Sequence, residues 1–212
     1  MINSKNFTIV DVETTGGSPF FSRIIEVGLL RVEHGEVVEE FQTLINPGQE
    51  IPEFITKMTG IQDRDVATAP TFAEIADELI TKFEDSVFVA HNVNFDYGFI
   101  KEEYRRLGYG FIADRLCTVR LSRSLYKEHK RHNLGEIIER FGFNTINRHR
   151  AFDDAKVLWD FLQHIKTEFE PDVVAKTMKQ ILIKSRMTAK MKTKLASEII
   201  YEDDTGKTFS LG

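Results

Sequence analysis

Four acidic residues occupy positions where the surrounding sequence is apolar, and these residues are the best suited to chemistry. Asp11 and Glu13 share one face of a segment that otherwise reads Phe, Ile and Val, because residues two apart in a strand point to the same side. Two acids on one buried face repel each other unless a cation lies between them. The spacing therefore favours a metal site, and the structural alternative is an edge-strand pair that faces water.

Helices are predicted to present the other two acids. Asp96 follows a short apolar strand and falls in the first turn of a predicted helix over residues 95–107, where the helix dipole favours negative charge. Helical periodicity puts Asp154 on the apolar stripe of a helix over residues 151–165, and Asp153 on its wetter side. We therefore expect Asp154, and not Asp153, to be a ligand. For Asp96 alone, a surface acid that satisfies the dipole is an equal alternative.

Together these acids favour metal-assisted hydrolysis. Carboxylate oxygens suit Mg²⁺ or Mn²⁺ better than zinc. Two such ions about 4 Å apart can hold the attacking and the leaving oxygen of a phosphodiester displacement. His149, in the approach to the helix of Asp154, is the candidate base for the attacking water. The remaining histidines are expected to be solvated: His34, His91, His129, His132 and His164.

The elements that must position these groups follow a recognisable order. Strands are predicted first and then alternate with helices, which indicates an α/β domain with a mixed sheet covered by helices. The predicted strands span residues 7–13, 24–32, 36–45 and 87–90, and the second and third form a hairpin. The predicted helices span residues 71–83, 95–107, 118–126, 133–141 and 151–165.

The charge distribution divides the chain of 212 residues into two parts. A main domain is expected over residues 1–170 and a basic extension over residues 171–212, because Lys176 to Lys194 contains seven basic residues and no acidic one. Apolar residues at helical spacings predict one or two amphipathic helices in the extension, and its end reads as a hairpin. The extension docks on the main domain, binds nucleic acid or meets a partner, and the sequence leaves these three open.

Composition excludes several classes of protein. The net charge of −5 argues against broad, charge-driven binding of nucleic acid, but it allows a nuclease whose acidic site is masked by metal. The longest apolar runs fall far short of the about 20 residues that cross a bilayer, and the start lacks a secretory signal. The single cysteine, Cys117, favours a reducing compartment. We therefore expect a cytoplasmic protein without a membrane partner.

Four segments resemble the motifs of the DnaQ-like, DEDD-type 3′-to-5′ exonucleases of the His-bearing subclass (DEDDh), which includes the proofreading epsilon subunit of bacterial DNA polymerase III. They are Ile9 to Gly16, Met58 to Ile61, His91 to Asp96 and His149 to Asp154. The resemblance covers roughly residues 5–168. It implies a ribonuclease-H-like mixed sheet of five strands flanked by helices, with the first three strands antiparallel, followed by the mostly helical C-terminal extension.

By matching positions, the resemblance also implies roles for individual residues. It makes Asp11, Glu13, Asp96 and Asp154 ligands of two divalent ions, Mg²⁺ or Mn²⁺, and His149 the general base. The backbone of Thr14, Thr15 and Gly16 would meet the terminal 3′-OH, while Gly60, Ile61 and Asn92 would line the pocket for base and sugar. For Gly60 and Ile61, a loop that ends a short helix is an equal reading. Arg148 and Arg150 flank His149 and are candidates for substrate phosphate.

The expected function is hydrolysis of single-stranded DNA from its 3′ end to nucleoside 5′-monophosphates, for proofreading or repair. Association with a polymerase or repair assembly is implied by the resemblance alone. Phe20 and Phe21, in a loop rich in Gly, Ser and Pro, are expected either to stack on a base or to pack in the core. The competing readings are an RNA-trimming exonuclease of the same family and a binding module for nucleic acid that no longer cuts.

Overall fold

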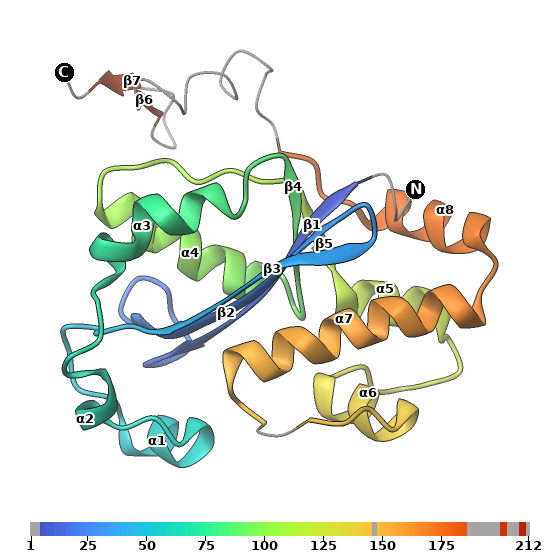
Figure 1. Cartoon of the computed structure of the whole chain (residues 1–212), viewed down its shortest axis with the longest axis horizontal. Helices are drawn as coiled ribbons and strands as arrows, with labels where there is room; N and C mark the ends of the chain where they lie inside the picture. Colours follow the sequence, from blue (N-terminus) through green and yellow to red (C-terminus); the bar gives the residue numbers. More distant parts are fainter. Residues whose placement is uncertain (1–4, 146–147, 186–199, 203–207, 211–212) are drawn as a thin grey trace.

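The computed structural model describes residues 5–145, 148–185, 200–202 and 208–210, and a five-stranded sheet runs through its centre (Figure 1). The strand order is β3-β2-β1-β4-β5. Strands β1, β2 and β3 are antiparallel, and β4 and β5 run parallel to β1, which confirms the mixed sheet. The strands are β1 (Asn6–Thr14), β2 (Ile24–Glu33), β3 (Glu36–Leu44), β4 (Ser86–Ala90) and β5 (Arg115–Cys117).

Strand β1 is the central strand, and its residues alternate between the two cores of the domain. Phe7 and Ile9 pack into the core on one face, and Val10 and Val12 pack into the core on the other. This period of two confirms the predicted face. It also means that the acids at positions 11 and 13 continue the face of Phe7 and Ile9.

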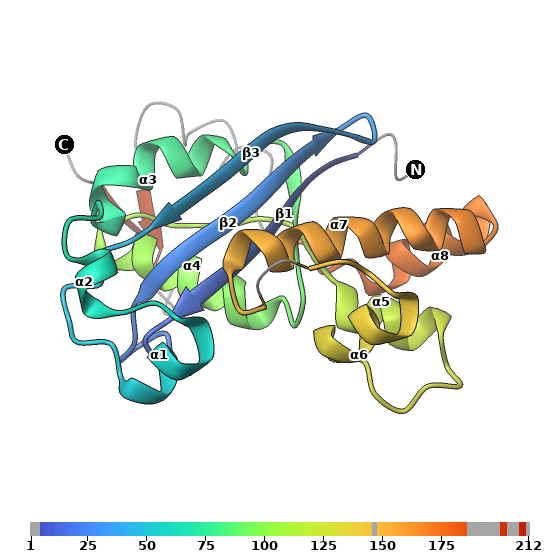
Figure 2. The same ribbon diagram turned by 60° about the horizontal axis from the view of Figure 1, so that its bottom comes forward.

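Helices cover both faces of the sheet (Figures 1 and 2). Helices α3 and α4 supply the core that contains Val10, and α5, α6 and α7 supply the core that contains Ile9. The five predicted helices are therefore present, with ends that differ by a few residues from the predicted ones. Their bounds are α3 (Phe72–Thr81), α4 (Asn94–Arg106), α5 (Thr118–Leu125), α6 (Leu134–Phe141) and α7 (Ala151–Glu168).

Three short elements were not identified from the sequence. Helices α1 (Glu53–Thr59) and α2 (Asp63–Val66) follow β3, and the sequence offered a short helix before Gly60 only as an alternative. They cover a small apolar cluster of their own that includes Ile25. Strand β5 has three residues, too few for a pattern of alternation to be recognised.

The first part of the extension packs on the main domain. Helix α8 (Pro171–Ile181) places Val174 and Met178 in the same core as α7. Just after it, the backbones of Ile183 and Arg115 exchange hydrogen bonds of 2.8 and 2.9 Å. This agrees with the expected amphipathic helix and with docking, the first of the three options. The predicted helical segment from Met187 to Leu195 lies outside the described residues.

The end of the chain contains the expected hairpin strands. Strand β6 (Ile200–Glu202) pairs antiparallel with β7 (Thr208–Ser210). Across the described parts of the chain, no helix combines the length and the apolar composition needed to span a bilayer.

Candidate active site

The first two acids lie near the carboxyl end of β1, beside β2. Asp11 is opposite Gly28 in the antiparallel ladder, and Glu13 is opposite Glu26. Glu13 is buried and Asp11 is half-buried. The register shifts by one residue between Glu13 and Thr14, so the regular ladder is interrupted directly beyond the second acid before pairing resumes at Thr14 and Ile24.

Asp96 joins this pair because β4 leaves part of β1 uncovered. The parallel ladder between β1 and β4 ends at the pair Ile9 and Val89. Beyond it, the backbone N–H of Val12 donates to Oδ1 of Asp96 at 3.2 Å. Asp96 lies in the first turn of α4, as the sequence predicted, and its burial excludes the surface-acid alternative. The carboxylate thus satisfies a β1 donor that the sheet does not pair.

A close approach between α7 and β2 sets the position of Asp154. A Cβ atom on Gly28 would lie 2.1 Å from the nitrogen of Phe152 and 2.4 Å from the carbonyl carbon of Ala151. Only glycine lets the first turn of α7 rest on the strand at this distance. Asp154, in that turn, is buried with 4% of its surface exposed, whereas Asp153 is half-buried, as the helical periodicity predicted.

An ion pair far apart in sequence fixes the start of the same helix. Arg150 donates two hydrogen bonds of 3.1 Å from Nε and one of 2.7 Å from Nη2 to the carboxylate of Glu26. The backbone N–H of Ala151 donates to Glu26 at 3.0 Å. Glu26 is fully buried, so this contact holds the first residues of α7 against β2. The Arg150 guanidinium, a candidate for substrate phosphate, is therefore engaged by a protein carboxylate.

The histidine and three of the acids meet around Arg148. The ligand atoms of Glu13, His149 and Asp154 lie within 4.8 Å of one another. Arg148 donates from Nη1 to Oδ1 of Asp154 at 2.7 Å, and its charge also lowers the pKa of Asp11. His149 has a positive φ of 61°, an uncommon conformation for a non-glycine residue.

The acids repel one another, which is the electrostatic signature expected of a cation site. Burial raises the pKa of Asp11 well above its ordinary range, and the charges of Asp96, Asp154 and Glu13 raise it further. Burial, followed by the charges of Asp154 and Glu26, raises the pKa of Glu13 to about 8. Burial also raises the pKa of Asp96 and Asp154. Buried carboxylate oxygens that carry excess negative charge fit Mg²⁺ or Mn²⁺.

Removing Arg148 is expected to increase the stabilisation that metal gives. Arg148→Ala deletes the cation that offsets the charge of Asp154 and its neighbours, so the metal-free protein loses stability and a divalent ion meets less competition for Asp154. The rise in Tm on adding Mn²⁺ to protein in EDTA should therefore be larger in Arg148→Ala than in the wild type. Arg131→Ala, which removes an exposed arginine paired with Glu136, is the matched control. An equal rise in Tm in the wild type, Arg148→Ala and Arg131→Ala would contradict the idea that Arg148 competes with metal for Asp154.

The pKa of Glu13 predicts a pH dependence with a definite sign. The folded state holds this proton more tightly than the unfolded chain, since burial raises the pKa from 4.5 to about 8. In EDTA, the free energy of unfolding of the wild type should therefore fall, relative to Glu13→Gln, as pH rises from about 5 to 8. We expect a relative loss on the order of 3 kcal/mol in denaturant titrations. Parallel stability curves for the two proteins would refute the shift.

Two histidines are wrongly predicted to be solvated. His132 is buried, with Nδ1 2.8 Å from the hydroxyl of Ser122 and Nε2 2.9 Å from the carbonyl of His129. His91 has Nδ1 2.9 Å from the hydroxyl of Thr118, and its Nε2 is buried without a partner among the described residues. Burial lowers the pKa of His91 to about 4. Both histidines lie in segments too short for burial to be read from periodicity.

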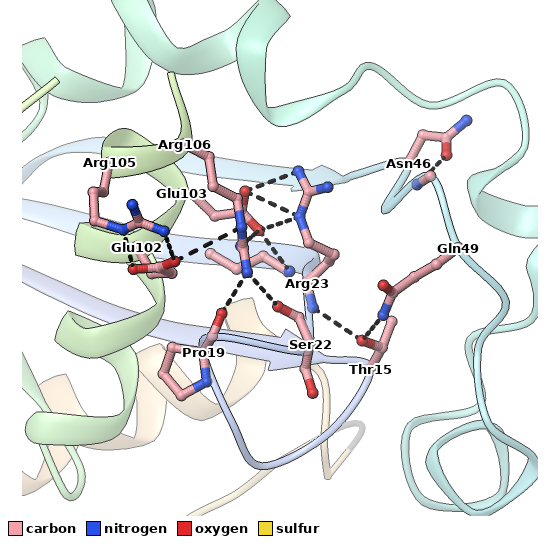
Figure 3. A network of polar contacts seen from close by, with 12 residues as sticks. Thr15, Pro19, Ser22, Arg23, Asn46, Gln49, Glu102, Glu103, Arg105 and Arg106 are labelled. Atoms are coloured by element: carbon pink, nitrogen blue, oxygen red, sulfur yellow. Dashed lines mark hydrogen bonds and ion pairs between the residues drawn. The ribbon is translucent and has the colours of Figure 1, made fainter. Parts of the chain in front are cut away.

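The residues expected to meet the terminal nucleotide lie in two places. At the end of β1, Thr14 and Thr15 are buried; the Thr14 hydroxyl donates to the carbonyl of Gly16 at 2.8 Å. The Thr15 hydroxyl accepts hydrogen bonds of 2.9 Å from the N–H of Arg23 and 2.6 Å from Nε2 of Gln49 (Figure 3). These contacts fix the backbone that leaves the acidic cluster.

The second group comprises Gly60, Ile61 and Asn92, which differ in exposure. Gly60 ends α1 in the left-handed region and is exposed, in keeping with the loop reading. Ile61 is buried in the apolar cluster beneath α1 and α2. Asn92 is exposed, with a φ of 64°, between β4 and α4. Of the three, Gly60 and Asn92 present their surfaces to solvent, and Ile61 packs inside.

Comparison with known proteins supplies relatives by sequence. A family model described as exonuclease (RNase_T) matches residues 8–162. The chain is 39% identical over 150 residues to a PolC-type DNA polymerase III of Caldanaerobacter subterraneus subsp. tengcongensis, covering 71% of this chain and 11% of that protein. It is 36% identical over 158 residues to the 3′-5′ exonuclease DinG of Bacillus subtilis, covering 74% of this chain and 17% of that protein. The chain thus spans a small part of the length of these relatives.

Solved structures share the fold. Exonuclease I superposes with a TM-score of 0.74 at 18% identity, over 81% of this chain and 43% of that one. The nuclease domain of 3′hExo, described as a DEDDh family member and solved with rAMP, gives a TM-score of 0.68 at 19% identity over 78% of this chain and 93% of that one. The family match over residues 8–162 and these relatives lead to one conclusion: the chain belongs to the exonuclease family, in its DnaQ-like DEDDh branch of 3′-to-5′ exonucleases.

Proposed function

We propose that the chain is a divalent-metal-dependent 3′-to-5′ exonuclease that hydrolyses single-stranded DNA ends to nucleoside 5′-monophosphates. The observation that carries the proposal is the convergence of Asp11, Glu13, Asp96 and Asp154 from β1, α4 and α7, where burial raises the pKa of all four and repulsion among the acids raises those of Asp11, Glu13 and Asp96 further. Such a cluster costs folding free energy in the absence of a cation. A nuclease site explains why the central strand carries it.

Each residue has a proposed part in this reaction. Asp11, Glu13, Asp96 and Asp154 would hold two ions, Mg²⁺ or Mn²⁺, which when bound supply Lewis acidity to the attacking and leaving oxygens. His149 lies within 4.8 Å of the ligand atoms of Glu13 and Asp154, which suits a base that takes the proton of the attacking water. The side chain of Arg148 is 33% exposed, so its guanidinium is suited to leave Asp154 and bind a substrate phosphate instead.

The backbone from Thr14 to Gly16 is proposed to receive the terminal nucleotide, together with Gly60, Ile61 and Asn92. The first three residues directly follow Glu13, and their conformation is fixed by the hydroxyl contacts of Thr14 and Thr15. The ion pair of Arg150 with Glu26 is proposed to hold the start of α7 and so to position Asp154. This role replaces the direct contact with substrate phosphate that the sequence suggested for Arg150.

DNA is the preferred substrate because the relatives by sequence are a DNA polymerase III of PolC type and the exonuclease DinG. By the same relationship, we propose proofreading or repair as the setting, in association with a polymerase or repair assembly. RNA is the second candidate, favoured by the structural neighbour 3′hExo, which was solved with rAMP.

The deciding experiment is digestion of matched single-stranded DNA and RNA oligonucleotides with a 5′ label, in Mg²⁺, Mn²⁺ or EDTA. The proposal expects a ladder that shortens from the 3′ end, release of nucleoside 5′-monophosphates and no digestion in EDTA. Preference for the RNA strand would support the second candidate. An intact strand in both metals would leave only a binding role, which Mn²⁺ calorimetry would test independently.

A further inference from the structure

The loop between β1 and β2 presents two phenylalanines to solvent. Phe20 is 71% exposed and Phe21 is 85% exposed, more than any other large apolar side chain in the described residues. This excludes core packing, one of the two roles considered for them. Leaving two adjacent aromatic rings in water is unfavourable by the hydrophobic effect, so a partner surface is expected to cover them.

The backbone beneath these rings is held by charged groups (Figure 3). Arg106 of α4 donates from Nη2 to the carbonyl oxygens of Pro19 and Phe20, at 2.5 and 3.1 Å. Its Nη1 lies 3.1 Å from Oε1 of Glu103, a residue that is 1% exposed. Across the loop, Arg23 binds the same carboxylate through Nε at 2.8 Å.

Turn contacts within the loop complete this support. The carbonyl of Ser18 accepts from the N–H of Phe21 at 3.1 Å and from the N–H of Ser22 at 2.8 Å. The exposed rings therefore extend from a backbone that is fixed at several points. A fixed platform loses less conformational entropy on binding than a mobile loop does.

The loop lies close to the acidic site. Pro19 Cγ is 3.5 Å from the position of a Cβ on Gly98, which follows Asp96 by two residues in α4. Gly98 lies a rise of about 3 Å along the helix axis beyond Asp96, so the loop packs against the same N-terminal part of α4 that carries this acid. The same loop begins with Thr14 to Gly16, proposed to meet the terminal nucleotide. The loop that carries both rings therefore borders the site in which the 3′ end would lie.

We propose that Phe20 and Phe21 form a stacking platform for unpaired bases just upstream of the 3′ terminus. The inference rests on the proposed function and adds a specificity determinant to it. A phenyl ring has a π-face and no hydrogen-bonding group, so it can stack on any base and distinguishes bases poorly. A base must leave its duplex partner to stack there, which favours single-stranded ends. A protein partner is the other occupant that an exposed aromatic pair can take, and the test separates the two.

The test measures kcat and KM in Mn²⁺ on two oligonucleotides. One is an unmodified single strand, and the other has abasic residues at the second to fourth positions from an intact 3′ terminus. For Phe20→Ala/Phe21→Ala, KM on the unmodified strand should rise at least about tenfold with kcat within about twofold. On the abasic strand, the KM of the wild type should already be raised, because there are no bases to stack. The double variant should have the same KM as the wild type on this strand.

Further variants separate stacking from simple apolar contact. Phe21→Trp should keep the low KM of the wild type on the unmodified strand. Phe21→Leu should raise KM most of the way to that of the double variant, because leucine has no π-face. Val173→Ala removes an exposed apolar side chain from α8 and should change neither constant. The dependence of KM on salt should keep its slope in the double variant, because its phosphate contacts are untouched.

The outcomes also distinguish the platform from the proposed function. If the wild type digests neither strand, the proposed function fails. If it digests both and the double variant has wild-type KM on the unmodified strand, the platform is refuted and a protein partner becomes the occupant. A fall in kcat at constant KM would equally overturn it. Both side chains are exposed, so we expect the double variant to keep the wild-type Tm, which a thermal melt checks.

Discussion

Asp154→Asn is expected to reduce metal-dependent digestion of single-stranded DNA by about 10³-fold or more, while Asp153→Asn stays within a few-fold of wild type. Asp154 is 4% exposed, and its ligand atoms lie within 4.8 Å of those of Glu13 and His149. Asparagine keeps the size of the side chain but removes the negative charge that a divalent ion requires. The neighbouring Asp153 lies on the wetter side of α7, so it is the matched control.

A second measurement shows whether Asp154→Asn acts through the metal or through folding. Burial raises the pKa of Asp154, which means that its charged form destabilises the metal-free protein. The variant should therefore have a Tm in EDTA at or above that of the wild type, and a smaller rise in Tm on adding Mn²⁺. Near-full activity in Asp154→Asn, or an equal loss in Asp153→Asn, would refute the assignment of this ligand.

Gly28→Ala is expected to have the second large effect, although position 28 carries no functional group. The added Cβ would lie 2.1 Å from the nitrogen and 2.3 Å from the Cα of Phe152. Both are backbone atoms, so no side-chain rotation relieves the clash and the start of α7 must move. Overpacking of this kind costs about 1–3 kcal/mol of folding free energy, and often more when backbone shifts. A shift of about 1 Å at Asp154 is enough to lose about 10²-fold in rate.

Gly110→Ala is the matched control, because a Cβ at Gly110 would meet no atom within 4 Å. Digestion rates and denaturant unfolding should show both losses in Gly28→Ala and neither in Gly110→Ala. The Mn²⁺-induced rise in Tm should also shrink in Gly28→Ala, since Asp154 leaves the cluster. Normal stability and normal activity in Gly28→Ala would contradict this prediction, because they would mean that the start of α7 can adapt without displacing Asp154.

The sequence predicted much of the site because local periodicity decides which way a side chain faces. The period of two in β1 put Asp11 and Glu13 on one face, and the helical period separated Asp154 from Asp153. The same rules predicted four of the five strands of the sheet and the five main helices. They missed β5, α1 and α2, which are too short to have a period. They also missed the burial of His91 and His132, whose contacts with Thr118 and Ser122 join separate segments of the chain.

Residue types and short-range spacing thus determined by themselves that this chain forms an α/β sheet, and they predicted that four acids and a histidine on it suit one metal site. Tertiary structure alone decided how they are held. Arg150 reaches Glu26 across 124 positions, Gly28 admits the backbone of α7, and Arg106 fixes a loop 87 positions away. Periodicity describes a side chain's direction relative to its own strand or helix. Which partner it meets depends on how those elements pack, and that is set by contacts across the whole domain.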